Sequence, residues 1–366
     1  MTFAMDQTAE RPRTRGTTLA GSRRGAYPPP PPARREHRRR GRSIARRGSI
    51  SSRVTERIAR RLKACYPHPM TPLRTLLERR ESVILMGILN RTPDSFSDGG
   101  RYQDDAAAIA RVDQMMAEGA AIVDIGAEST RPGSRAISDA EQIDRLGDVV
   151  RAAAERGAIV SIDTTSPVVA ERALRDGAAV VNSVELGPAA ELGALAAAHG
   201  ASLVLMHSRG SMADMAGFSV YAEDAYGDVV ADVAREWSAA AERAHQRGLP
   251  REDLILDPGL GFFKNARQSI TLVARLSELC RLGHPVLVGP SRKSFVARAA
   301  IGDGPVPPPS QRLGGSLAAA IACVEQGAAI VRTHDVAETK QALAVAAAIH
   351  RARPGSGAGG AACTTS

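Results

Sequence analysis

Eight short apolar runs of this sequence each lead directly into polar residues, and these polar residues include most of the side chains that could do chemistry. Asp163, Asn182 and Asp257 supply two carboxylates and an amide. Such groups can together satisfy a flat heterocycle that carries N–H donors and carbonyl acceptors. The other breaks contain Asn90, Asp124, His207, residues 289–294 and residues 332–335. We therefore expect a pocket for a heterocyclic ligand.

Cationic side chains are more numerous at these breaks than the carboxylates require. They are Arg131, Arg292, Lys293, Arg332 and His334. The surplus indicates an anionic ligand such as a phosphate or a diphosphate.

Asn90 offers a neutral oxygen that could help to hold a hard cation such as Mg²⁺, which usually keeps several waters and relies on ligand phosphate. No carboxylate pair stands out as a hydrolytic acid–base couple, and no Ser-His-Asp or Cys-His arrangement is evident. Two long polar loops, 91–102 and 127–138, are candidate lids that order around a bound ligand.

The elements that must position these residues alternate along the chain as short apolar runs and longer, Ala-rich helical patterns. Eight buried strands, each followed by a helix within about 260 residues, predict a parallel (β/α)8 barrel of the TIM type, an α/β fold. A doubly wound open sheet is the alternative, and the strand count favours the barrel. The longest helix is predicted over 221–248. The strands are predicted at 83–89, 121–125, 158–162, 179–184, 202–206, 254–256, 285–289 and 329–333.

The positive charge of the chain, formally +9, belongs to its N-terminal segment. Residues 1–69 hold eighteen Lys and Arg against four Asp and Glu, whereas the rest holds thirty against thirty-five. The segment is also rich in Pro, Gly and Ser, and predicts a disordered basic extension. It could attract nucleic acid or anionic membrane, act as an organellar transit peptide, or lie outside the natural product if translation starts at Met70.

The body of the chain, residues 70–350, is predicted to be the barrel, followed by a flexible tail over 351–366. Its net charge of −5 and its few aromatic residues argue against nucleic-acid binding. No apolar stretch reaches the length of a membrane span and no signal-peptide pattern opens the chain. The four cysteines lack metal-ligand spacing, so we expect reduced thiols and a cytoplasmic location.

Several motifs in this order resemble dihydropteroate synthase, a pterin-binding enzyme family. They are "MGILNRTPDSFSDGG", "DIGAESTRPGS", "SIDT", "VVNSV", "MHSRG", "LILDPGLGF", "VGPSRKSF" and "VRTHDV", and they extend from about residue 83 to about residue 345. The resemblance implies a transferase of folate biosynthesis. It joins (7,8-dihydropterin-6-yl)methyl diphosphate to 4-aminobenzoate, forms 7,8-dihydropteroate and releases diphosphate. It also implies a homodimer, Mg²⁺ as cofactor and a target for sulfonamides.

The resemblance also implies roles for single residues. Asp163, Asn182 and Asp257 would hold the pterin ring, and Lys293 would contact both the pterin and the pocket of the incoming amine. Asn90 would bind Mg²⁺. Thr130, Arg332 and His334 would bind the diphosphate, while Arg131, Pro132, Phe262 and Ser291 would help to form the aminobenzoate pocket.

Four residues depart from the family pattern. Arg91 adds a charge beside Asn90, Ser183 replaces an aspartate, Phe263 replaces a glycine and Pro290 stiffens a turn. A further hypothesis is that Phe263, beside Phe262, reshapes the aminobenzoate pocket and alters sulfonamide sensitivity.

Three alternatives remain at the level of sequence. A catalytically weak paralogue would carry these departures, a pterin-dependent methyltransferase would lack a diphosphate site, and a non-catalytic protein would bind pterin without turnover. The intact "ESTRPGS" and "SRKSF" motifs favour a working synthase.

Overall fold

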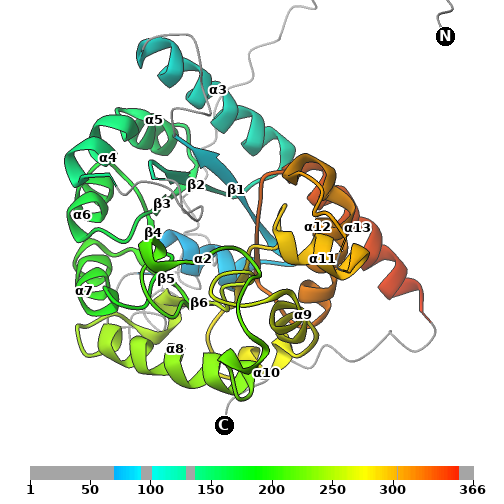
Figure 1. Ribbon diagram of the computed structural model, residues 1–366. Coiled ribbons are helices and arrows are strands. Elements are labelled where there is room, and N and C mark those ends of the chain that lie inside the picture. The colour runs from blue at the N-terminus through cyan, green and yellow to red at the C-terminus, as the bar shows by residue number, and fades with distance from the viewer. Residues whose placement is uncertain (1–69, 92–100, 129–136, 303, 354–366) are drawn as a thin grey trace, which may run out of the picture. The chain divides into compact units, whose positions relative to one another are not determined.

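The structure, a computed structural model, describes residues 70–91, 101–128, 137–302 and 304–353, with backbone alone for 101–104. The predicted basic extension over 1–69 lies outside the described residues, and so does most of the predicted tail over 351–366. Helices surround a central ring of strands (Figure 1).

Eight parallel strands form one sheet in the order β6-β5-β4-β3-β2-β1-β8-β7. A bridge between Leu256 and Val286 joins its two ends, so the sheet closes into a barrel. The predicted (β/α)8 barrel is thereby confirmed. The strands are β1 (Ile84–Asn90), β2 (Ile122–Gly126), β3 (Ile159–Asp163), β4 (Val180–Ser183), β5 (Ser202–Met206), β6 (Leu254–Asp257), β7 (Leu287–Val288) and β8 (Ile330–Thr333).

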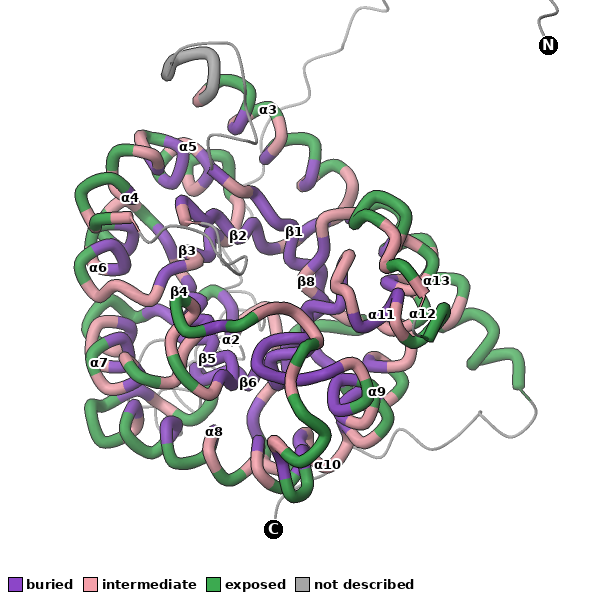
Figure 2. Tube along the Cα trace, viewed as in Figure 1, coloured by how far each residue is buried: buried purple, intermediate pink, exposed green. Residues whose placement is uncertain are grey.

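The outer layer consists of helices whose inner faces are buried and whose outer faces are exposed (Figure 2). Its members are α3 (Arg101–Glu118), α4 (Asp139–Leu146), α5 (Val149–Glu155), α6 (Pro167–Arg175), α7 (Ala189–His199), α8 (Val229–His245), α9 (Ala266–Ala274), α10 (Leu276–Cys280), α11 (Ser294–Ile301), α12 (Leu313–Glu325) and α13 (Val336–Ala352). Short 3₁₀ turns are η2 (Met212–Asp214), η3 (Glu223–Ala225), η4 (Arg251–Asp253) and η5 (Pro309–Gln311).

Side chains alternate along each strand between two cores because successive residues of a strand point to opposite faces. On β4, Val181 packs in the layer between sheet and helices, while Val180 packs in a separate cluster inside the barrel. Asn182, two residues after Val180, therefore points into the barrel above that cluster. The same two-residue step places Asp124 above Ile122 and Arg332 above Ile330.

The lower end of the barrel is closed by a helix at the start of the described chain, α2 (Pro72–Arg79). Leu73 on this helix is fully buried among Ile84, Val180 and other residues of the interior cluster. The N-cap Thr71 accepts a hydrogen bond from the Arg74 backbone. Its hydroxyl also lies 2.8 Å from Ser202 Oγ and 2.8 Å from Asp253 Oδ1. The helix therefore plugs the barrel floor and contacts strands that come much later in the chain.

The helix predicted over 221–248 is shorter than expected. It begins at Val229, because Asp228 caps its first turn by accepting from the Val230 and Ala231 backbones. Residues before it form a loop that includes η3, and α3, with 18 residues, is longer. None of the described helices combines the length and apolar composition needed to cross a lipid bilayer.

Candidate active site

A layer of polar side chains lies above the apolar interior, at the carboxyl ends of the strands. At its centre Asp124, which is fully buried on β2, accepts hydrogen bonds at Oδ2 from Arg332 Nε at 2.6 Å and from Asn182 Nδ2 at 3.0 Å. Arg332 also donates through Nη2 to Asp163 Oδ2 at 2.7 Å. Four strands, β2, β3, β4 and β8, thus contribute to one network.

Two carboxylate oxygens of this network have no hydrogen-bond partner among the described residues. They are Oδ1 of Asp124 and Oδ1 of Asp163, and both are buried. Burial raises the pKa of Asp163 to about 7, even though the charge of Arg332 acts in the opposite direction. Buried polar atoms are nearly always hydrogen-bonded, so these two oxygens are suited to a ligand that brings N–H donors.

Asp257 and Lys293 form the opposite side of this polar layer. Asp257 Oδ1 accepts from the Gly259 backbone at 2.8 Å, and burial raises the pKa of this carboxyl group. Lys293 donates to the Leu260 carbonyl at 2.6 Å, and its Nζ lies 4.4 Å from the centre of the Phe262 ring. Burial lowers the pKa of Lys293 to about 8. The lysine therefore connects the carboxylate with an aromatic wall.

Ser291 and His334 face each other at the ends of β7 and β8. Ser291 Oγ lies 3.0 Å from His334 Nδ1 and accepts from the His334 backbone at 3.2 Å. Arg292 turns away from this pair, and its Nε donates to Asp335 at 3.0 Å. A cation neutralised in this way is less suited to a ligand anion than sequence position alone suggests.

Asn90 ends β1, and no hydrogen bond of its side chain to another described residue is present. Within the described part of the chain, no group of three or more His, Cys, Asp or Glu side chains could hold a metal ion. One amide oxygen fits a Mg²⁺ ion that takes its remaining ligands from water and phosphate. Thr130, Arg131 and Pro132, and much of both predicted lid loops, lie outside the described residues.

A second polar network lies beneath the loop that follows β6. Lys264 is fully buried, with Nζ 3.0 Å from His207 Nδ1, and His207 Nε2 lies 2.9 Å from Glu236 Oε2. Burial lowers the pKa of Lys264 to about 7, and the charge of Asp257 acts in the opposite direction. In its protonated form Lys264 only donates, so His207 Nδ1 accepts and Nε2 carries the ring proton. Burial and the charge of Lys264 lower the pKa of His207 to about 4, so the ring is neutral.

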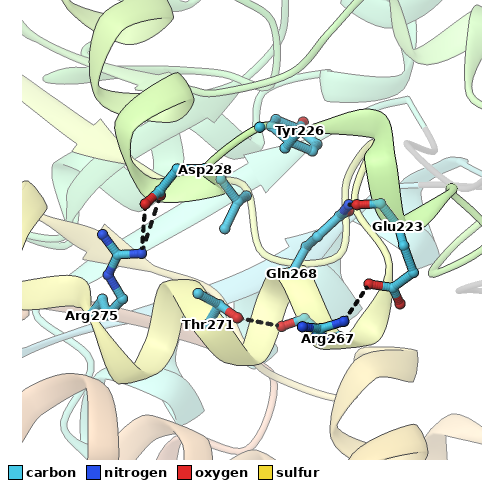
Figure 3. Close-up of a pocket in the computed structure, with 9 residues that line it drawn as sticks. Glu223, Tyr226, Asp228, Arg267, Gln268, Thr271 and Arg275 are labelled. Carbon is cyan, nitrogen blue, oxygen red and sulfur yellow. Dashed lines mark hydrogen bonds and ion pairs between the residues drawn. The ribbon is translucent and has the colours of Figure 1, made fainter.

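A surface cavity of about 240 Å³ lies between the η3–α8 segment and α9 (Figure 3). Its charged side chains already pair with each other: Arg275 with Asp228 and Arg267 with Glu223. This cavity lies away from the strand ends and offers no unneutralised charge for a phosphate.

The comparisons with known proteins agree with this geometry. The sequence model of the family described as pterin binding enzyme matches residues 86–334. Dihydropteroate synthase from Synechocystis sp. is 41% identical over 288 residues, which cover 78% of this chain and 96% of that protein. The chain belongs to the dihydropteroate synthase family. Its members transfer a pterinylmethyl group.

Solved structures of family members support the same assignment. Dihydropteroate synthase from Clostridium difficile, crystallised in the presence of pteroic acid, matches with a TM-score of 0.66 and 34% identity, over 74% of this chain and 98% of that chain. The Thermus thermophilus enzyme in complex with 4-aminobenzoate matches with a TM-score of 0.63 and 39% identity, over 74% and 95%.

Arg91, the first departure from the family pattern, does not direct its charge toward Asn90. Its Nε donates to the Arg145 carbonyl at 2.9 Å, and its guanidinium pairs with Asp105 on α3. Asn90 and Arg91 are consecutive, so their side chains leave the strand end on opposite sides. The charge of Arg91, expected beside Asn90, is therefore neutralised by the ion pair with Asp105.

Ser183 and Phe263 likewise leave the polar layer. Ser183 Oγ donates to the Glu185 carbonyl at 2.8 Å, outside the barrel interior. The centres of the Phe263 and Tyr221 rings lie 5.5 Å apart. The backbone of Phe263 has a φ of 51°, a left-handed conformation that favours glycine. Pro290 precedes Ser291, and nothing in the structure distinguishes its effect.

Asp124 and Lys264 are the residues whose importance the sequence concealed. Asp124 follows an apolar residue inside a strand, and the sequence marks it only as a polar break, without indicating a role. Its inward position could have been found from the alternation of β2, where Ile122 and Asp124 share one face. Lys264 gives no such signal, because its partners are backbone carbonyls and the ring of His207, which lies 57 residues earlier in the chain.

Proposed function

We propose that this chain condenses (7,8-dihydropterin-6-yl)methyl diphosphate with 4-aminobenzoate to give 7,8-dihydropteroate and diphosphate. The observation that carries the proposal is the buried, unpartnered Oδ1 of Asp163, set beside Arg332 in the polar layer. A pterin brings ring N–H and amino donors in one plane, which is what such oxygens lack. Membership of the dihydropteroate synthase family supports this assignment.

The pterin ring would lie on the apolar interior cluster, with its edge facing Asp163, Asn182 and Asp257. Asn182 is held by Asp124, so its carbonyl oxygen remains available as an acceptor. Asp124 acts as a positioning residue, because it fixes both Asn182 and Arg332 without reaching the surface. Lys293 lies between Asp257 and Phe262 and can contact the pterin on one side and the incoming amine on the other.

The diphosphate would lie toward Arg332 and the Ser291–His334 pair, together with Thr130. Asn90 would hold Mg²⁺, which would supply positive charge for the leaving oxygens when bound. Arg332 carries a full charge at all relevant pH, since its carboxylate partners raise its pKa further. These cations stabilise charge that develops on the leaving group, which is the largest electrostatic demand of the reaction.

Bond cleavage and bond formation balance without a nucleophilic side chain. The methylene carbon–oxygen bond breaks with its electron pair on the diphosphate, and the pterin ring delocalises the resulting methylene cation. The aminobenzoate nitrogen then donates its lone pair to this carbon and releases one proton. Phe262, Ser291, Arg131 and Pro132 would hold the amine in line.

The test measures diphosphate release by the purified chain with both substrates and Mg²⁺. We expect release that depends on 4-aminobenzoate, accompanies dihydropteroate, stops with a chelator and collapses in Lys293→Ala. Lys340→Ala, at an exposed position on α13, is the matched control. Tight pterin binding without release would contradict the proposal and favour the catalytically weak paralogue or a non-catalytic pterin-binding protein.

We further propose a cytoplasmic homodimer. Exposed apolar side chains on α11 and α13, at Ile301, Val345 and Ile349, support an interface between copies. Cys280 and Cys323 are free thiols, which suits a reducing compartment. A monomer mass in sedimentation at micromolar concentration would contradict the dimer.

A further inference from the structure

The lysines of this chain are few and are placed unusually. Only four of its 48 basic residues are lysines, at 63, 264, 293 and 340, and two of these converge on one loop. That loop, residues 258–263, follows Asp257 at the end of β6 and contains Phe262. Lys293 donates to the Leu260 carbonyl, and Lys264 donates to the carbonyls of Gly259 and Phe262.

Lys264 lies in a cage of acceptors. Its Nζ is 3.2 Å from the Gly259 carbonyl, 3.0 Å from the Phe262 carbonyl and 3.3 Å from the His207 carbonyl, in addition to the contact with His207 Nδ1. A lysine is almost never fully buried unless it is paired or hydrogen-bonded, and here backbone carbonyls and an imidazole supply the partners. The Gly259 carbonyl also accepts from the Phe262 N–H at 3.1 Å, so Lys264 matters most as the donor to the Phe262 and His207 carbonyls.

The loop needs this support because its backbone is unusual. Gly259, Gly261 and Phe263 all have positive φ, at 66°, 81° and 51°. A Cβ atom at Gly259 would lie 2.1 Å from the His207 carbonyl oxygen, so β5 and the loop approach closely at that point. Non-glycine residues at positive φ persist only where their surroundings determine the conformation.

We propose that Lys264 is a positioning residue for the amine substrate: its buried ammonium fixes the loop 258–263 and thereby sets the position of the Phe262 ring. This inference rests on the proposed function for its kinetic part. Asp257 depends less on Lys264, because its backbone belongs to β6, where it pairs with Met206 of β5. The two substrates should therefore respond differently when Lys264 is changed.

Arginine cannot take this place, although the chain uses it almost everywhere else. A guanidinium is planar and directs its donors outward in a fork, whereas an ammonium presents three donors from a single point. Carbonyls from three residues and one imidazole nitrogen surround a point, so Lys264→Arg should behave like a loss of the cage.

The kinetic test compares the full-length chain with Lys264→Met and Lys264→Arg, and uses Lys340→Met as the matched control. We expect KM for 4-aminobenzoate to rise about tenfold or more in both Lys264 variants, while KM for the pterin diphosphate changes less than about threefold. Equal changes in both KM values, or none, would overturn the inference while wild-type activity upholds the proposed function. An inactive wild type would instead overturn the proposed function.

A second measurement leaves Lys264 in place and therefore does not depend on whether a variant at this position folds. With ¹⁵N-lysine labelling, the intact chain gives at most four ammonium signals, and Lys→Arg changes at 63 and 340 remove the two that do not belong to the loop. We expect one ammonium whose protons exchange slowly with water and whose shift moves when 4-aminobenzoate binds beside a pterin. Absence of a slowly exchanging ammonium, or a signal indifferent to 4-aminobenzoate, would overturn the inference.

Discussion

The two ends of this barrel satisfy their polar groups in different ways. At the floor, the Thr71 hydroxyl has three partners within the protein, and apolar side chains of α2 fill the space between the strands. At the mouth, Oδ1 of Asp124 and Oδ1 of Asp163 have none among the described residues. Phe263 near the mouth also has a left-handed backbone.

This difference indicates that the floor of the barrel stabilises the fold, whereas the mouth reduces its stability. Burial of apolar surface at the floor stabilises the fold and leaves nothing for a ligand to bind. Unpartnered carboxylates at the mouth reduce stability but are ready to accept donors from a substrate. Substitutions at the two ends should therefore separate stability from activity.

The largest separation is expected for Asp163→Asn. The variant keeps an oxygen that accepts from Arg332 but loses the carboxylate that faces the ligand, so kcat/KM should fall by about 100-fold or more. In the wild type, the folded-state pKa of Asp163 lies above the value of a free carboxyl group. The wild type therefore loses stability as pH rises from about 4 to about 7. At pH 8 Asp163→Asn should therefore be more stable, on the order of 2–4 kcal/mol.

The pH dependence provides the internal control for this prediction. Below about pH 3 the wild-type carboxyl group is protonated in both the folded and the unfolded state, and the difference in stability between the two proteins should shrink toward zero. Thermal unfolding across pH 3–8 measures this difference. A variant that is less stable than wild type at pH 8 would contradict the description of the mouth as a destabilised region.

Leu73→Ala should show the opposite behaviour at the floor. Loss of a fully buried leucine leaves a cavity under the strands, which typically costs about 2–5 kcal/mol of unfolding free energy. Both KM values should remain within about twofold of wild type, since the polar layer is separated from α2 by the interior cluster. Urea unfolding and steady-state kinetics on the same preparation test both parts, and a selective change in either KM would count against the separation.

Phe263 allows the strain near the mouth to be measured by itself. Phe263→Ala and Phe263→Gly both remove the ring from Tyr221, but only glycine relieves the positive φ. Both should be less stable than wild type, and Gly should exceed Ala by about 1 kcal/mol, the reverse of the usual order. Sulfonamide inhibition of wild type and Phe263→Gly tests the specificity hypothesis, and equal inhibition constants would contradict it.

Thr71→Val is expected to have a smaller effect than Leu73→Ala at the same end of the barrel. It removes a buried hydroxyl with three partners and an N-cap, at a cost of about 1–2 kcal/mol. Thr75→Val, on the half-buried second turn of the same helix, controls for the change in side-chain type. Equal losses in the two variants would indicate that the Thr71 contacts to Ser202 and Asp253 contribute little.

The fold was predictable because each strand is a short apolar run with a clear end. The run at 202–206 coincides with β5, and the run at 158–162 is displaced by one residue from β3. The helix predicted over 221–248 is too long at its start, because "YAEDAYGD" has helical composition but Asp228 provides a strong cap. The sequence does not predict α2, since the role of this helix depends on contacts with strands far along the chain.

The site was predictable in its residue types and not in its pairing. Position at strand ends predicts Asp163, Asn182 and Arg332 on one face. In the structure Asp124 binds Asn182 and Arg332, and Arg332 also binds Asp163. Both carboxylates bind the arginine through one oxygen and leave the other without a partner among the described residues. This arrangement depends on side-chain rotamers, which residue spacing does not determine. The same limit applies to Arg91, whose partner Asp105 lies on a different element.

The plug helix has a consequence for how the chain acquires its fold. Thr71 is separated from Ser202 by 131 residues and from Asp253 by 182, so the ribosome delivers α2 long before its binding surface. Eight residues of helix are too short to persist alone in water. The segment should therefore stay unstructured until β5 and β6 have been made, and dock among the last events of folding. In a pulse of hydrogen exchange during refolding, its amides should gain protection later than those of β1, although β1 follows it directly in the sequence.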